Sequence, residues 1–133
     1  MIDDITVGDT LTLSARYSEC GEWGGHIEKL HLIRKQNDLW ITLYIDTVSC
    51  DDDPNATRKQ IIDKSKRLKK EDKNSIVMYI DKFMVDSKKD NFPLGNSSHS
   101  FMIINKDTTL KFTDWSLQWR EFKTLRQTIF NEI

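Results

Sequence analysis

Two segments of the sequence alternate between apolar and polar residues with a period of two, and this pattern constrains the fold more than any other feature. Side chains point to alternate faces along a β-strand, so such a segment forms a strand with one buried face. In residues 10–18 the apolar positions are Leu11, Leu13, Ala15 and Tyr17. In residues 39–48 they are Leu39, Ile41, Leu43 and Ile45, with Trp40, Thr42 and Tyr44 on the other face. The chain is therefore expected to build a half-buried sheet.

The chain between these two strands predicts a third strand and two reversals. Residues 19–25 contain three of the five glycines, whose access to positive φ suits a tight turn between strands. Residues 26–35 alternate less regularly, and the turn-forming residues 36–38 (Gln-Asn-Asp) follow them. Three consecutive strands with short connections predict an antiparallel meander.

The lysine-rich segment 58–73 fits two kinds of structure. It holds eight basic and three acidic residues, and its only apolar residues are Ile61, Ile62 and Leu68. We favour a short edge strand near residues 59–66, because lysines on an edge strand discourage pairing with other chains. An exposed helical turn is the alternative.

The second half of the chain predicts two helices separated by a hairpin. Ile76, Ile80, Phe83 and Met84 recur at helical spacing within residues 75–89, with Val77 beside them. Residues 101–104 and 108–113 predict the hairpin. Asp114 is positioned to cap a last helix from Trp115 to about Asn131. The inward stripe of that helix would hold Leu117, Phe122, Leu125, Ile129 and Phe130, flanked by Trp115 and Trp119.

Together these elements predict an α+β fold in a single domain that spans residues 1–133. A chain of this length buries about two thirds of its unfolded surface in one core. A mainly antiparallel sheet of five to six strands, with both helices packed on one face, would bury every apolar stripe in two layers.

Composition excludes several classes of protein. The apolar fraction of 38% is too high for a disordered chain. No uncharged apolar run approaches the roughly 18 residues of a membrane span, and residues 1–9 lack the positive charge of a signal peptide. The sequence therefore predicts a cytoplasmic protein with no membrane partner. The two cysteines, Cys20 and Cys50, are too few for a disulfide scaffold, and the predicted strand order holds them roughly 9–10 Å apart.

The densest group of reactive side chains lies in residues 19–28, which contain a thiol, three carboxylates, a tryptophan and a histidine. One hypothesis is a small metal- or cysteine-dependent enzyme on the hairpin from Cys20 to His31, using Cys20, His26 and Glu28. Against it, His26 and Glu28 would point to one face of a strand and His31 to the other. His99, in a Ser-Ser-His-Ser run, has no nucleophile motif around it. We therefore predict no catalytic residue, no metal site and no cofactor.

The formal net charge of −1 conceals a segregation of charge along the chain. Residues 1–57 carry a net charge of −7, residues 58–90 one of +5, and residues 91–133 one of +1. The electric field of segments with opposite net charge steers association with oppositely charged partners. Because residues 58–73 contain no aromatic side chain for base stacking, nucleic-acid binding is not expected.

The Gly-Glu-Trp-Gly-Gly-His hairpin within residues 21–27, the α+β layout and the acidic first half resemble small uncharacterised bacterial immunity-type proteins. Such proteins are encoded beside secreted toxins and neutralise them. The resemblance implies a non-enzymatic protein-binding domain whose acidic surface meets a basic toxin domain. Trp23 and Trp40 would be its aromatic anchors. The predicted partner-binding residues are Glu19, Glu22, Trp23, Glu28, Trp40, Asp51, Asp52 and Asp53.

Overall fold

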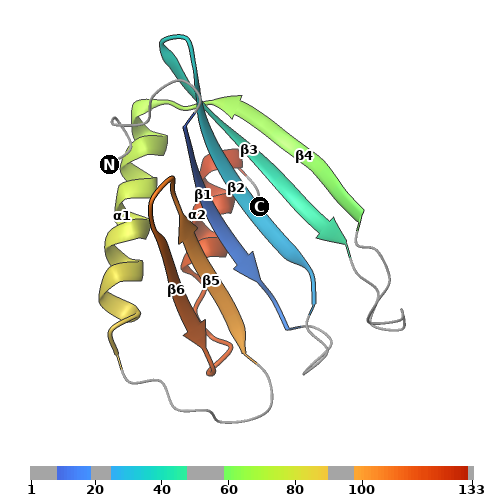
Figure 1. Cartoon of the computed structure of the whole chain (residues 1–133), viewed down its shortest axis with the longest axis vertical. Coiled ribbons are helices and arrows are strands. Elements are labelled where there is room, and N and C mark those ends of the chain that lie inside the picture. The colour runs from blue at the N-terminus through green and yellow to red at the C-terminus, as the bar shows by residue number, and fades with distance from the viewer. Residues whose placement is uncertain (1–8, 19–24, 48–58, 90–97, 132–133) are drawn as a thin grey trace.

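The computed structural model describes residues 9–18, 25–47, 59–89 and 98–131. In this part of the chain, six strands form one antiparallel sheet and two helices lie against it (Figure 1), so the predicted α+β fold is confirmed. In chain order the elements are β1 (Thr10–Arg16), β2 (Ile27–Lys35), β3 (Asp38–Thr47), β4 (Lys59–Arg67), α1 (Lys70–Asp86), β5 (His99–Ile104), β6 (Thr109–Asp114) and α2 (Glu121–Phe130).

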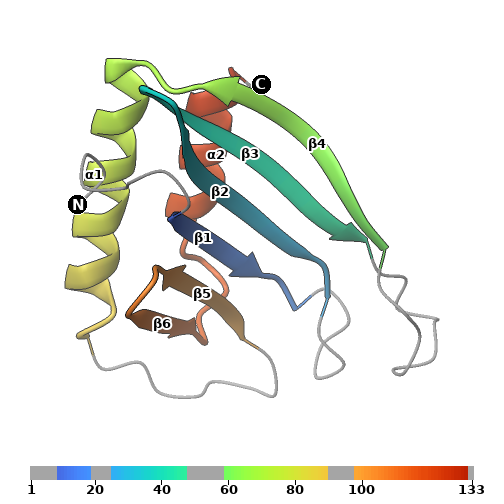
Figure 2. The ribbon, with the colours of Figure 1, turned by 45° about the horizontal axis from the view of Figure 1, so that its top comes forward.

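The sheet order is β4-β3-β2-β1-β5-β6, and each neighbouring pair is antiparallel (Figure 2). The first three strands form the predicted meander, and β5 and β6 form the predicted hairpin. The lysine-rich segment forms the edge strand β4 over Lys59–Arg67, as favoured above, and its last residues begin α1. The hairpin of β5 and β6 joins the meander beside β1, so β1 lies inside the sheet and not at its edge.

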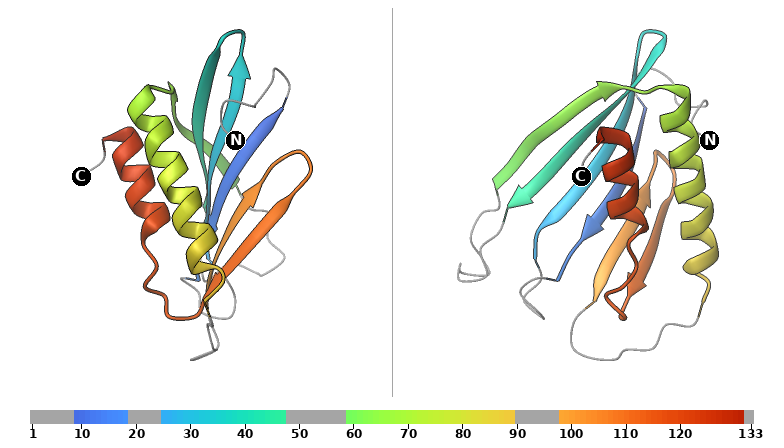
Figure 3. Two further views of the ribbon diagram at one scale, coloured as in Figure 1. Left: turned by 90° about the vertical axis from the view of Figure 1, so that its left-hand side faces the viewer. Right: turned by 180° about the vertical axis from the view of Figure 1, so that it is seen from behind.

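Both helices cover the same face of the sheet (Figure 3). The apolar residues that alternate along β1, Leu11, Leu13 and Ala15, are at most 1% exposed and lie in the core between sheet and helices. Phe101 from β5 and Phe122 from α2 complete the centre of that core with no measurable exposure. The alternation seen in the sequence therefore marks the face that the helices cover.

Helix α1 begins earlier than predicted, and its buried stripe differs from the predicted one at one position. The Asp72 carboxylate accepts a hydrogen bond from the Lys69 backbone N–H at 2.9 Å, which starts the helix at Lys70. Ile76, Ile80 and Phe83 are buried as predicted. The expectation for Met84 was wrong, because that side chain is 38% exposed and the inward positions are completed by Tyr79 instead.

Helix α2 is shorter than predicted, beginning at Glu121 and not at Trp115. The buried Asp114 side chain accepts hydrogen bonds from the backbone N–H groups of Ser116 (3.0 Å) and Trp119 (2.8 Å), which folds the preceding residues into a turn. Leu117, expected in the inward stripe, takes a left-handed φ of 62° in that turn and is 41% exposed. Phe122, Leu125 and Ile129 are buried as predicted.

Candidate functional site

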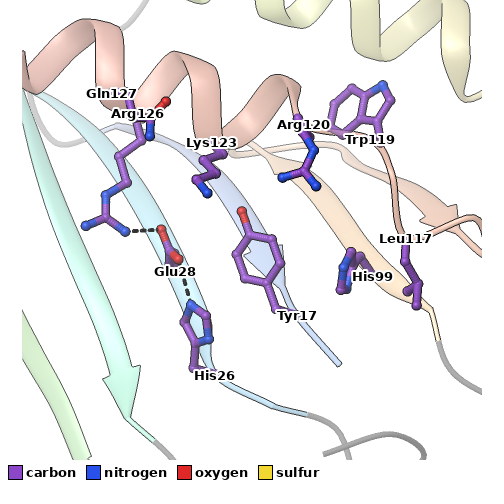
Figure 4. Close-up of a pocket in the computed structure, with 10 residues that line it drawn as sticks. All are labelled: Tyr17, His26, Glu28, His99, Leu117, Trp119, Arg120, Lys123, Arg126 and Gln127. Carbon is purple, nitrogen blue, oxygen red and sulfur yellow. Dashed lines mark hydrogen bonds and ion pairs between the residues drawn. The ribbon is translucent and has the colours of Figure 1, made fainter. Parts of the chain in front are cut away.

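A cavity of about 440 Å³ opens between the N-terminal part of α2 and the sheet below it, at the ends of β1, β2 and β5 (Figure 4). Its lining residues come from four separate segments of the chain. They are Tyr17, His26, Glu28, His99, Leu117, Trp119, Arg120, Lys123, Arg126 and Gln127.

Tyr17 stands in the middle of the cavity floor with a histidine on each side (Figure 4). The His26 ring stacks on it with centroids 4.9 Å apart, and the His99 ring meets its edge at 5.2 Å. Sheet pairing causes this arrangement, because β1 lies between β2 and β5. The Tyr17 backbone N–H donates to the His26 carbonyl at 3.0 Å, which continues the β1 and β2 pairing past the strand ends.

The Glu28 carboxylate links β2 to α2 through two partners. Its Oε2 lies 2.6 Å from His26 Nε2, and its Oε1 accepts a hydrogen bond from Arg126 Nη1 at 2.5 Å. Burial alone would raise the pKa of Glu28, but the hydrogen bonds from His26 and Arg126 outweigh that effect and lower it. Glu28 is therefore ionised at neutral pH, although its side chain is only 9% exposed.

His99 is held by the chain segment that follows β1. Its Nδ1 accepts a hydrogen bond from the Ser18 backbone N–H at 3.1 Å. Because a backbone N–H can only donate, Nδ1 must present its lone pair, and the neutral ring then carries its proton on Nε2. His99 in this arrangement is a hydrogen-bond donor.

Three cations from α2 and its N-cap position line the same cavity. Arg120, Lys123 and Arg126 are spaced three residues apart, which places them near one face of a helix. The figure shows all three on the side of α2 that faces the sheet (Figure 4). Among the described residues that line the cavity, Glu28 is the sole carboxylate. The cavity is thus rich in hydrogen-bond donors and positively charged.

The residues predicted from the sequence do not gather in one place within the described part of the chain. Glu28 is buried in the cavity. Trp40 is half-buried on the open face of the sheet, which is the face that the helices do not cover, and Lys35 Nζ lies 5.4 Å from the centroid of its ring. His31 lies on that open face too, as predicted, where its Nδ1 is 2.9 Å from Thr12 Oγ1. The two cysteines, Cys20 and Cys50, lie outside the described residues. So do the remaining predicted partner-binding residues, which are Glu19, Glu22, Trp23, Asp51, Asp52 and Asp53.

The sequence interpretation identified His26 and Glu28 as neighbours on one face but missed their partners. The alternation of residues 10–18 predicts Tyr17 on the buried face of the strand and gives no sign of its place in the cavity. The sequence interpretation does not include Arg120, Lys123 or Arg126 among the site residues. The spacing Arg-x-x-Lys-x-x-Arg is visible in the sequence and is the signal that indicates a cationic helix face.

No protein-family model matches the sequence, and no curated protein matches it. Across residues 9–18, 25–47, 59–89 and 98–131, no three His, Cys, Asp or Glu side chains come close enough together to hold a metal ion. Neither helix in these ranges has the length and apolar character needed to cross a bilayer.

Proposed function

We propose that this protein is a non-enzymatic binding protein and that its cavity takes an anionic group, a phosphate or a carboxylate. The observation that carries the proposal is the placement of Arg120, Lys123 and Arg126 over one cavity whose described lining holds a single carboxylate. That carboxylate already has His26 and Arg126 as partners. The remaining positive charge favours an anion, because charge-assisted hydrogen bonds are about twice as strong as neutral ones.

The uncharged lining of the cavity fits the same ligand chemistry. The His99 tautomer described above places a proton on Nε2, and the Tyr17 hydroxyl points toward Arg120 and Lys123 (Figure 4). Carboxylate oxygens and the unprotonated oxygens of a phosphate accept hydrogen bonds, so a site built from guanidinium, ammonium, imidazole and phenol donors matches them. The anion belongs either to a small molecule or to a side chain of a protein partner.

Calorimetric titration with inorganic phosphate, and separately with acetate, tests this proposal and distinguishes the two anions. Lys123→Ala should weaken binding about tenfold or more, because a hydrogen bond to a charged group contributes roughly 1.5–3 kcal/mol. Lys111→Ala is the matched control, since Lys111 is an exposed cation in β6 away from the cavity. Absence of binding by both anions at millimolar concentration, or equal affinities in the two variants, would contradict the proposal.

Neutralisation of a basic toxin through an acidic surface is retained as a separate proposal. Its remaining support is the acidic charge of residues 1–57, because most of the predicted surface lies outside the described residues. Charge reversal at Glu22 and Asp52 should slow association with a cognate toxin and reduce its salt dependence. Unchanged association kinetics would reject that surface.

The contact between His26 and Glu28 specifically favours the second candidate function, a cysteine-dependent enzyme. A carboxylate that holds an imidazole is the usual support for a general base that activates a thiol. In a Cys50→Ser background, Cys20 should then react with iodoacetamide rapidly at neutral pH, and His26→Ala should slow the reaction. A slow reaction that His26→Ala leaves unchanged would exclude this chemistry.

A further inference from the structure

The cavity beneath α2 is larger than an anionic group alone requires. Its volume is about 440 Å³. Cavities of about 300–1,000 Å³ are typical of sites for small organic ligands. A phosphate or carboxylate group is only a few times the size of a water molecule, whose share of the liquid volume is about 30 Å³. Most of the cavity is therefore available to the rest of the molecule that carries the anion.

The charged and the apolar lining residues lie at different ends of this cavity. Glu28 and Arg126 lie at one end, and Leu117 and Trp119 lie at the other (Figure 4). Lys123 lies between the two ends in the same view. An anion that contacts Lys123 therefore has apolar side chains on one side of it, within the same cavity.

Leu117 has a backbone conformation that leucine disfavours. Its φ of 62° lies in the left-handed region, where the Cβ atom of any residue other than glycine comes too close to a carbonyl oxygen. The hydrogen bonds from Ser116 and Trp119 to Asp114 hold the turn on both sides of it. The side chain is 41% exposed, so the core gains little from this arrangement. Disfavoured backbone conformations of this kind concentrate at sites that hold ligands.

The side chain of Trp119 presents a fixed aromatic surface at the same end of the cavity. Its Nε1–H donates to Asp86 Oδ2 of α1 at 2.9 Å, and its ring centroid lies 4.6 Å from that of Phe101. Because the single polar atom of the indole already has a partner, the surface that this side chain offers to a ligand is carbon. Tyr17 adds a second aromatic ring to the lining. Aromatic rings pack favourably on such surfaces.

We propose that the ligand of the cavity is a small organic anion that carries an aromatic ring, with its anionic group at Lys123 and its ring packed against Leu117 and Trp119. This inference rests on the proposed anion site and names the class of molecule that fills it. The ring covers the exposed Leu117 side chain, which gives the disfavoured turn a role that the core does not.

Calorimetric titration of the full chain with two matched pairs of anions tests the inference. The pairs are methyl phosphate with phenyl phosphate, and acetate with benzoate. At pH 8 the two phosphate esters carry the same charge, because the second pKa of such esters is about 6. In the pair whose anion binds, the aromatic member should bind about tenfold tighter or more, because the ring leaves water. If the small member binds and the aromatic member binds no tighter, this inference is wrong and the anion site stands. If none of the four binds, the anion site is wrong as well.

Two variants separate the ring from the anionic group. Leu117→Asn removes the apolar side chain but suits the turn, because asparagine tolerates the left-handed region. It should weaken the aromatic ligand about fivefold or more, since apolar contact is lost, and leave the affinity for the small anion unchanged. Lys123→Ala should weaken both members of a pair by the same factor. Val85→Asn is the control for Leu117→Asn, because Val85 is 57% exposed on α1 and does not line the cavity.

Nuclear Overhauser contacts between the ligand and the protein locate the ring directly. The phenyl protons of bound phenyl phosphate should show contacts with the methyl groups of Leu117 and with the indole protons of Trp119. Equal loss of affinity for both members of a pair in Leu117→Asn would overturn the inference. So would a bound ring that contacts neither Leu117 nor Trp119.

Discussion

At the scale of single residues, the cavity depends on a buried ionic contact between distant parts of the chain. Glu28 and Arg126 are 98 residues apart in sequence, and their side chains are 9% and 21% exposed. A charge withdrawn from water in this way relies on its partner, because removing one member leaves the other unpaired in a poorly solvated site. The same contact fixes the position of α2 over β2.

A double-mutant cycle measures this dependence. Arg126→Met should lower the free energy of unfolding by roughly 3–5 kcal/mol, since it leaves the Glu28 carboxylate without its strongest cation. Combining it with Glu28→Leu should cost less than the sum of the two single changes, because no unpaired charge remains. Urea unfolding of the four proteins gives the coupling energy, and additive single effects would contradict the contact.

Stability should fall in acid through two groups. Burial, and then the charge of Lys29, lower the pKa of His31 below 6.5, and the pKa of Glu28 lies below 4.5. In both cases the unfolded chain takes up a proton at a higher pH than the folded protein does, so stability increases with pH through each window. The free energy of unfolding should decline below about pH 6.5 and again below about pH 4.5.

Urea unfolding from pH 8 to pH 4 checks this prediction. His31→Gln should remove the first decline and leave the second. A variant that follows the wild-type curve through both windows would assign the first decline to another group.

At the scale of elements, periodicity predicted the strands and the middle of each helix, and local hydrogen bonding decided the ends. A helix from Trp115 was expected because Asp114 is a capping residue type and Leu117 extends the apolar stripe of the later residues. Asp114 instead satisfies the backbone N–H groups of Ser116 and Trp119 and competes with the helix. The spacing of apolar residues does not show whether such a side chain will hold the backbone in a turn or allow the helix to begin.

Asp114 should therefore be needed for both stability and binding. Asp114→Ala removes acceptors for Ser116 and Trp119 and should destabilise the protein by about 2 kcal/mol or more. It should also weaken anion binding, because the turn positions Arg120 at the start of α2. Thermal unfolding and the phosphate titration measure the two effects. Asp107→Ala, an exposed change in the β5 and β6 hairpin, should stay within about 0.5 kcal/mol of wild type.

At the scale of the whole molecule, the site could not be derived from the sequence because it depends on sheet order. His26 and Glu28 are two residues apart on one strand, so their contact follows from strand geometry. His99 reaches Tyr17 only because β5 pairs with β1, and the sequence gives no sign of that pairing. Two histidine segments with no motif of their own therefore meet through a long-range strand contact.

Anion binding in the cavity should stabilise the molecule as a whole. A ligand that binds only the folded state stabilises it in proportion to the logarithm of its concentration. Phosphate should therefore raise the unfolding temperature of the wild type. In Lys123→Ala this effect should shrink, because Lys123 lines the cavity. An equal phosphate effect on the unfolding temperature of both proteins would contradict the cavity as the binding site.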